Sequence, residues 1–259
     1  FNTWLIVVNF AVFLAGALFP RLGVVLLEWG SFSTQRLFLL EVWRLVSFQF
    51  LHANLMHVGF NMLGLYFFGS LVEQYLGKKR YAAFYLVCGL SGGVMYMLLN
   101  LVGLMGLPLP GALTVNATTP LVGASAGVFG VIVACAYIAP NAVVHLLFPP
   151  IPMKMRTFAY GYVAFVALNL FLIRGANQGG DAAHLGGAIA GFYFIRRPHL
   201  LRDFFDVFKN SNLPPDGRKR SASEAEIDAI LDKIQREGIH SLTPAEKKIL
   251  AQNTRDRRR

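Results

Sequence analysis

Long apolar stretches separated by short polar connections dominate the sequence of 259 residues. Most stretches measure about 18 to 24 residues, and an α-helix of that length crosses a hydrocarbon core of roughly 30 Å. The pattern predicts an all-α fold, a polytopic membrane bundle of six transmembrane helices. No small-residue cleavage site follows the first stretch, so we expect it to be retained as a helix. The stretches lie at about residues 4–26, 54–76, 81–104, 121–139, 157–174 and 181–196.

Composition agrees with a membrane-embedded chain. Hydrophobic residues make up 55% and charged residues 15% of the sequence, values that soluble domains rarely combine. The net charge of +10 would suit nucleic acid, but the basic residues lie in short connections and in the tail, where membrane topology explains them. The two cysteines, Cys88 and Cys135, lie inside apolar stretches, which favours neither disulfides nor a metal site. We expect contact with the lipid bilayer, no cofactor, no metal and no nucleic-acid partner.

The same basic residues predict the orientation of the chain. Residues 78–80, 154–156 and 196–197 carry most of the positive charge between stretches, whereas the connection 105–120 has no charged residue. The positive-inside rule then places both termini in the cytoplasm, and we expect a multi-pass protein of a bacterial inner membrane. The outer connection 27–53 is long and rich in aromatic residues, which predicts short helices in the headgroup layer.

The last quarter of the chain is polar and predicts a separate part. Residues 1–200 should form the membrane domain, 201–220 a linker, and 221–259 a small cytoplasmic helical module. Within this module Thr243 and Glu246 have the spacing of a capping box and should open the second helix of a short hairpin. So short a hairpin offers no enclosed pocket, so we expect a regulatory or docking appendage without chemistry.

Strongly polar side chains inside the apolar stretches are costly in lipid, so each is a candidate for function. Near the starts of the second, fourth and sixth stretches the sequence has His57 with Asn61, Ser125, and His184. By the predicted orientation all three helices begin on the outer side. We therefore expect these four side chains to lie at one depth, and the site to open to the outer face.

Glycines give the fourth and sixth stretches a reason to touch. Gly123 and Gly127 could face Gly187 and Gly191, because small residues at helical spacing let two backbones come close. The serine hydroxyl and the imidazole on these helices would then be within hydrogen-bonding reach, which is how a base activates a weak nucleophile. Taken alone, the serine is more often explained by helix packing, whereas an interhelical hydrogen bond and a functional role explain the histidine equally well.

The remaining polar side chains have alternative explanations. Asn61 and His57 can donate hydrogen bonds to a developing oxyanion, although interhelical hydrogen bonds alone would also explain them. His52, taken by itself, is better explained as an ordinary interfacial histidine. Asp181 lies three residues before His184 and could complete a triad, but we favour a role in capping the sixth helix.

Four short motifs occur in order along the chain: Trp43-Arg44, His57-x-x-x-Asn61, Gly123-x-Ser125 and Ala183-His184-x-x-Gly187. Together they resemble the rhomboid family of intramembrane serine proteases over about residues 1–197. The resemblance implies that Ser125 is the nucleophile and His184 its base, without a third, carboxylate member. It further implies an oxyanion hole formed by His57, Asn61 and the backbone N–H of Ser125, with structural support from His52, Trp43, Arg44, Gly123, Phe129, Gly187 and Gly191.

Two positions depart from the family pattern. Ala126 follows the serine where the family often has glycine, and Phe129 stands where a family tyrosine often packs on the histidine ring. Alanine in place of glycine at residue 126 is a small change in side-chain volume. The face of a phenylalanine can still stack on an imidazole, so the lost hydroxyl affects only fine positioning.

The resulting prediction is an intramembrane serine endopeptidase that cleaves transmembrane segments of single-pass or polytopic membrane proteins near the outer face. One alternative is a proteolytically inactive rhomboid-like protein that binds membrane helices for quality control. A small-solute transporter is disfavoured, because we find no inverted repeat. The first outer connection and the fifth stretch are candidate gate elements, the latter through its bulky residues Phe158, Tyr160, Tyr162 and Phe165.

Overall fold

The computed structural model describes residues 1–107, 109, 111–145, 150–173, 177–201, 204–205, 230, 233, 241–246 and 249. The chain divides into two compact units, Phe1–Asp206 and Val207–Arg259. In the second unit Thr243 and Glu246 exchange the capping-box hydrogen bonds that the sequence predicts, 2.7 Å and 3.3 Å long. Most of the predicted linker and hairpin lies outside the described residues, so the hairpin stays a prediction.

Helices occupy each of the six predicted stretches. Of the described helices, three are long and apolar enough to cross a membrane by length and composition. These are Leu55–Leu76, made of α5 (Leu55–Gly64), the π-helical η2 (Leu65–Gly69) and α6 (Ser70–Leu76); α7 (Lys78–Leu104); and Met155–Ile173, made of α9 (Met155–Leu168) and the π-helical η3 (Asn169–Ile173). The others are α1 (Asn2–Leu18), α2 (Pro20–Gly30), α8 (Ser125–Ile138) and α10 (Gln178–Ile195), with the short 3-10 helix η4 (Pro198–Leu201) at the end.

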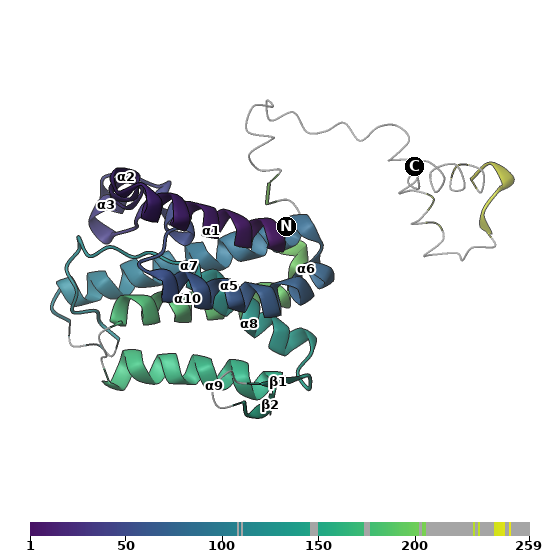
Figure 1. The fold of residues 1–259 in the computed structure, drawn as a ribbon. Coiled ribbons are helices and arrows are strands. Elements are labelled where there is room, and N and C mark those ends of the chain that lie inside the picture. The colour runs from purple at the N-terminus through teal and green to yellow at the C-terminus, as the bar shows by residue number, and fades with distance from the viewer. Residues whose placement is uncertain are drawn as a thin grey trace. The chain divides into compact units, whose positions relative to one another are not determined.

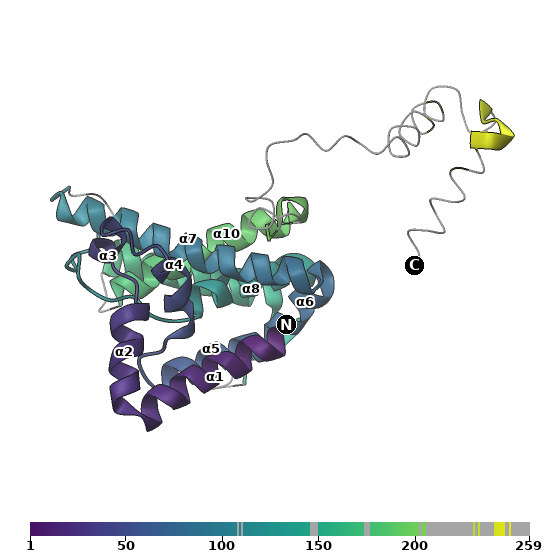
Figure 2. The same cartoon turned by 90° about the horizontal axis from the view of Figure 1, so that it is seen from above.

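The prediction of one continuous first helix over residues 4–26 is wrong. The chain turns a corner between α1 and α2 at Pro20, which Figure 2 shows as a sharp change of direction. Proline lacks an N–H and disfavours the helical conformation of the residue before it, so α1 ends there. The corner is tight, because a Cβ atom on Gly23 would lie 2.7 Å from the carbonyl oxygen of Gly16.

The first outer connection contains short helices, as the sequence predicts, whereas their depth in a membrane stays a prediction. Phe32 anchors the connection, since its side chain is fully buried. Its backbone N–H donates to the carbonyl of Leu121 at 3.0 Å and its carbonyl accepts from Leu121 at 2.7 Å. The connection is thereby fixed to the segment that precedes Ser125. Its helices are α3 (Thr34–Phe38), α4 (Arg44–Ser47) and the 3-10 helix η1 (Phe48–Phe50).

Three helices, α7, α8 and α10, form the centre of the first unit, and α9 lies at its edge on the side away from α1 (Figure 1). Gly187 and Gly191 bring α10 against α8, as predicted, but the facing residues are Ala126 and Gly130. The predicted partner Gly127 instead packs against the ring of Tyr85 on α7. The matching surface is therefore shifted by three residues along the fourth stretch.

The cause of this shift is the position at which α8 begins. The apolar stretch starts near residue 121, but the helix starts only at Ser125. Gly123 has a φ of +130°, a conformation that side chains rarely adopt and that no helix contains. Gly123 is therefore outside the helix and cannot take part in its packing face.

A small β-hairpin, which the sequence does not predict, lies between α8 and α9. Strand β1 (Val143–His145) pairs antiparallel with β2 (Pro152–Lys154). The N–H of Met155, the first residue of α9, donates to the carbonyl of Ala142 at 2.8 Å. The hairpin therefore fixes the first turn of α9.

Candidate active site

Ser125 and His184 come together at the junction of α8 and α10. The Oγ atom of Ser125 lies 2.8 Å from Nε2 of His184, a hydrogen-bonding distance. The serine is the first residue of α8, and the histidine lies in the second turn of α10. The close approach of the two helices at Gly187 brings these side chains together, as the glycine pattern predicts.

The His184 ring is held by stacking. The ring of Phe129, one helical turn after Ser125, lies parallel to it, with centroids 4.4 Å apart and an angle of 8° between the planes. From the sequence we expect that a phenylalanine can stack on the histidine ring without a tyrosine hydroxyl, and Phe129 does stack on it. The face of the ring sets the plane of the imidazole, whereas the serine sets the direction of Nε2.

Asp181 does not cap its helix, which corrects the favoured prediction. Helix α10 begins at Gln178 with Asn177 at the N-cap position, so the aspartate lies in the first turn. Its Oδ1 is 3.8 Å from Nδ1 of His184, which is longer than a hydrogen bond. Within the described part of the chain this Nδ1 has no hydrogen-bond partner. The arrangement is a dyad with a nearby carboxylate.

His57 and Asn61 lie on one face of α5 and line the same cavity as the dyad. Asn54 caps this helix by accepting from the N–H of His57 at 2.9 Å. The amide of Asn61 donates to the carbonyl of His57 at 2.9 Å, which leaves its second N–H for another acceptor. A Cβ atom on Gly123 would lie 2.6 Å from Nε2 of His57 and 3.5 Å from the Ser125 hydroxyl, so the imidazole sits beside the nucleophile only because residue 123 is glycine.

His52 is buried in the protein, with 7% of its surface exposed, and its place at the membrane interface stays a prediction. Its Nε2 accepts from the N–H of Ala124 at 3.5 Å, and its ring meets that of His57 edge to face at 5.0 Å. The reason for its burial is the backbone before Ser125, which folds over it. His52 therefore supports both the segment before Ser125 and the ring of His57.

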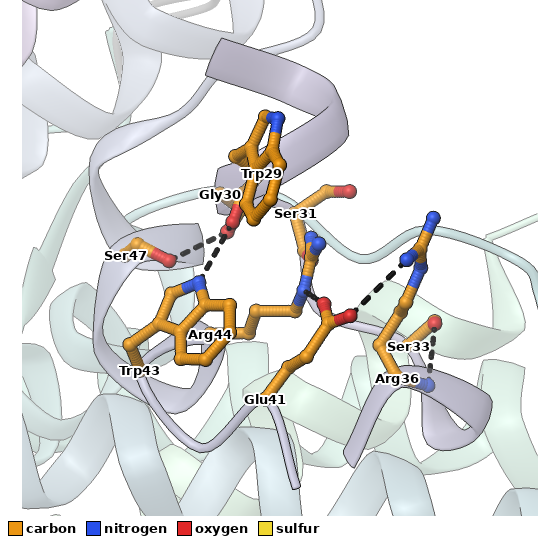
Figure 3. Close-up of polar contacts among 9 residues, drawn as sticks. All are labelled: Trp29, Gly30, Ser31, Ser33, Arg36, Glu41, Trp43, Arg44 and Ser47. Atoms are coloured by element: carbon orange, nitrogen blue, oxygen red, sulfur yellow. Dashed lines mark hydrogen bonds and ion pairs between the residues drawn. The ribbon is translucent and has the colours of Figure 1, made fainter. Parts of the chain in front are cut away.

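Trp43 and Arg44 brace the first outer connection, as Figure 3 shows. Only 2% of Arg44 is exposed; its guanidinium donates to the carbonyl of Ser31 at 2.7 Å and pairs with Glu41. The indole N–H of Trp43 donates to the carbonyl of Trp29 at 3.0 Å. Both carbonyls lie at the end of α2, where backbone acceptors lack partners within the helix.

Sequence reasoning missed Glu41, which lies at the centre of this network (Figure 3). Its carboxylate accepts from Arg44 and, at 3.1 Å, from Arg36. Desolvation alone would raise the pKa of Glu41, but the hydrogen bonds from the two arginines hold that pKa below its usual value. The sequence did contain a signal for Glu41 as an ion-pair partner. It is the only acidic residue between Glu28 and Glu73 and lies three residues before an arginine.

The dyad opens into a cavity of about 1200 Å³. Apart from the polar candidates, its walls are mostly aromatic and aliphatic side chains of α5, α8 and α9. A hydroxyl next to an imidazole, with N–H donors in apolar surroundings, is suited to acyl transfer. Among the described residues no three His, Cys, Asp or Glu side chains gather as metal ligands. Representative wall residues are Phe60, Phe67, Phe158 and Tyr162.

Comparison with known proteins adds family evidence. The model of the Rhomboid domain matches residues 39–197, and that of a family of unknown function, DUF6576, matches residues 218–256. Rhomboid protease AarA of Providencia stuartii is 31% identical over 167 residues, which cover 62% of this chain and 58% of that protein. Rhomboid protease GluP of Bacillus subtilis is 28% identical over 153 residues, 59% of this chain and 25% of that protein. The chain thus matches between a quarter and three fifths of these relatives.

Proposed function

Because the chain belongs to the rhomboid family and is an integral membrane protein, we propose that it is an intramembrane serine endopeptidase that cleaves transmembrane segments of other membrane proteins. The observation that carries the proposal is the distance of 2.8 Å between Oγ of Ser125 and Nε2 of His184 at the wall of a large cavity. Two relatives that are named rhomboid proteases support it.

In the proposed reaction Ser125 attacks the scissile carbonyl while Nε2 of His184 accepts the hydroxyl proton. The imidazolium then gives that proton to the leaving amine, and an acyl-enzyme remains. Water, deprotonated by the same imidazole, attacks the ester and releases the second product with the serine restored.

Three N–H groups are suited to stabilise the oxyanion of each tetrahedral intermediate. The backbone N–H of Ser125 belongs to the first residue of α8 and so has no partner in its own helix. Nδ1 of His57 accepts from the N–H of Ala53 at 3.4 Å, so the neutral ring carries its proton on Nε2, the atom beside Gly123. The free N–H of Asn61 is the third donor.

The proposed topology has six transmembrane helices, cytoplasmic termini and a site near the outer face of a bacterial inner membrane. Helices α5, α8 and α10, which carry the site, start at the end opposite to the basic residues at 78–80, 154–156 and 196–197. We further propose that residues 1–200 form the membrane domain, 201–220 a linker and 221–259 a cytoplasmic module. The limits of the two family matches support this division.

Substrates of such a site are single-pass or polytopic membrane proteins with a helix that unwinds readily. A transmembrane helix satisfies its backbone hydrogen bonds internally, so a protease must open it before attack. Glycine, proline or small residues near the outer end of the substrate helix lower that cost. We therefore expect a model substrate with such residues to be cleaved faster than one with a leucine-rich segment.

The direct test is labelling of the detergent-purified protein with a serine-directed fluorophosphonate, together with cleavage of a model transmembrane substrate. We expect labelling to disappear in Ser125→Ala and cleavage to disappear in both Ser125→Ala and His184→Ala. Ser70→Ala is the matched control, because Ser70 is exposed on α6 and should leave labelling unchanged. If the wild-type protein binds the substrate but neither labels nor cleaves, the alternative of an inactive, helix-binding relative is correct.

A further inference from the structure

The Phe129 ring is in contact with two other rings. One face lies on the imidazole of His184 at 4.4 Å. The other ring is Tyr162 of α9, with centroids 4.6 Å apart and planes at 36°. Phe129 thus contacts both the histidine of the dyad and a residue of the helix at the edge of the bundle.

The row of rings continues along α9 and returns to the second membrane stretch. Tyr162 is followed by Phe158 at 6.2 Å, and Phe158 stacks on Phe68 of η2 at 5.7 Å and 25°. Val163 and Val166 of α9 belong to the same apolar cluster as Phe129, but their side chains are smaller and carry no ring. Tyr162 is therefore the residue of α9 that contacts Phe129 ring to ring.

The imidazole needs such support because its other nitrogen is not anchored. In a triad a carboxylate holds Nδ1 and thereby fixes the ring. Here Asp181 is 3.8 Å away, and Nδ1 of His184 has no hydrogen-bond partner among the described residues. Among the described residues, the serine hydroxyl and the face of Phe129 are the contacts that orient the ring.

We propose that Tyr162 is a positioning residue for the catalytic base, which fixes the plane of the His184 imidazole through its contact with Phe129. The inference rests on the proposed protease function. It makes the alignment of the base depend on α9, one wall of the cavity through which substrate reaches Ser125. A displaced α9 leaves the base loosely held, and its return after substrate entry restores the base.

The test is the steady-state cleavage of a model transmembrane substrate by three variants. For Tyr162→Ala we expect kcat to fall about tenfold and KM to change less than about twofold, since the loss concerns the chemical step. Tyr162→Phe should stay within about twofold of wild type, because the ring and not the hydroxyl acts. Tyr160→Ala is the matched control on the same helix, because Tyr160 is as exposed as Tyr162 (42% and 40%) but lies outside the row of rings, so kcat should not change.

A double-mutant cycle shows whether the effect passes through Phe129. If it does, Tyr162→Ala should add less than about twofold to the loss in kcat caused by Phe129→Ala. Multiplicative losses would contradict the proposal, as would a change confined to KM or an impaired Tyr162→Phe. Tyr162→Leu keeps most of the apolar volume and should still lose kcat, which separates positioning from misfolding.

Failure of the inference differs from failure of the proposed function. If wild-type protein neither cleaves substrate nor reacts with the fluorophosphonate, the function itself is wrong. If the wild type cleaves and Tyr162→Ala cleaves with the same kcat, only the positioning role is wrong.

Discussion

The first outer connection, which is joined to the segment before Ser125, and α9, which lines the cavity, are built from different interactions. The first outer connection is fixed by hydrogen bonds, with Arg44 joining the end of α2 to Glu41 and Phe32 joined to Leu121 through the backbone. Helix α9 is joined to the site by aromatic stacking through Tyr162 and Phe158.

This difference matters because the two kinds of interaction respond differently to motion. Directional hydrogen bonds to buried groups are lost abruptly when their partners move. Stacked rings can slide and reform at modest cost. The comparison indicates a fixed outer connection and a movable wall at α9.

The largest expected effect comes from breaking the fixed outer connection. Arg44→Ala removes the hydrogen bond to the Ser31 carbonyl and leaves Glu41 without its main partner. We expect a loss of about 2 kcal/mol in the free energy of unfolding, because a buried guanidinium loses hydrogen bonds to a charged and to a backbone acceptor. Unfolding by heat or denaturant in detergent measures it.

Arg36→Ala is the matched control, because this arginine binds the same carboxylate but is exposed. Its removal should lower the free energy of unfolding by less than about 1 kcal/mol. Equal losses in Arg36→Ala and Arg44→Ala would show that burial of Arg44 does not stabilise the connection.

The movable wall should respond in activity more than in stability. Phe158→Ala removes the stack with Phe68 and loosens α9 against the second stretch beyond the turn that the hairpin fixes. We expect kcat/KM for a transmembrane substrate to rise about two- to fivefold if α9 admits the substrate, whereas cleavage of a short soluble peptide stays unchanged. Phe165→Ala removes an exposed ring of α9 that takes no part in the stack and should change neither. An equal gain with both substrates would exclude a role in substrate entry.

Acid should weaken the fixed outer connection and spare the movable wall. The two arginines lower the pKa of Glu41 in the folded protein, so the folded state binds fewer protons than the unfolded state. The stabilisation is therefore present above the unfolded carboxyl pKa, about 4.3, and is lost as the pH falls through the lower folded value. Unfolding temperatures measured between pH 6 and pH 3 should decline less in Glu41→Gln than in wild type. If the unfolding temperatures of Glu41→Gln and wild type declined in parallel as the pH falls, Glu41 would not contribute to the acid sensitivity.

The features that the sequence predicted are those set by local composition and spacing. Long apolar runs predicted the helices. The positions of Ser125, His184 and the glycines of α10 predicted that α8 and α10 are in contact. Pro20 was also a local signal for the end of a helix. The turn was not predicted, because the apolar residues continue on both sides of the proline.

The features that were missed depend on contacts between distant residues. Ala126 and Gly130 face α10 because α8 starts only at Ser125. The helix starts there because the φ of Gly123 is not helical. The stack of Phe129 on Tyr162 joins residues on separate helices, and no short motif encodes it. The hairpin before α9 combines two strands too short for their pattern to be seen.

The smallest expected effect separates a dyad from a triad. Asp181 is 3.8 Å from Nδ1 of His184, too far to accept its hydrogen bond, and it lies in the first turn of α10, where a negative charge is favourable. Asp181→Asn keeps the shape and removes the charge, so we expect kcat to fall less than about threefold. In a serine triad the same substitution lowers kcat by about four orders of magnitude. A loss above about a hundredfold would show that the carboxylate reaches the imidazole during the reaction, and the stack of Phe129 and Tyr162 would then no longer be needed to hold the base.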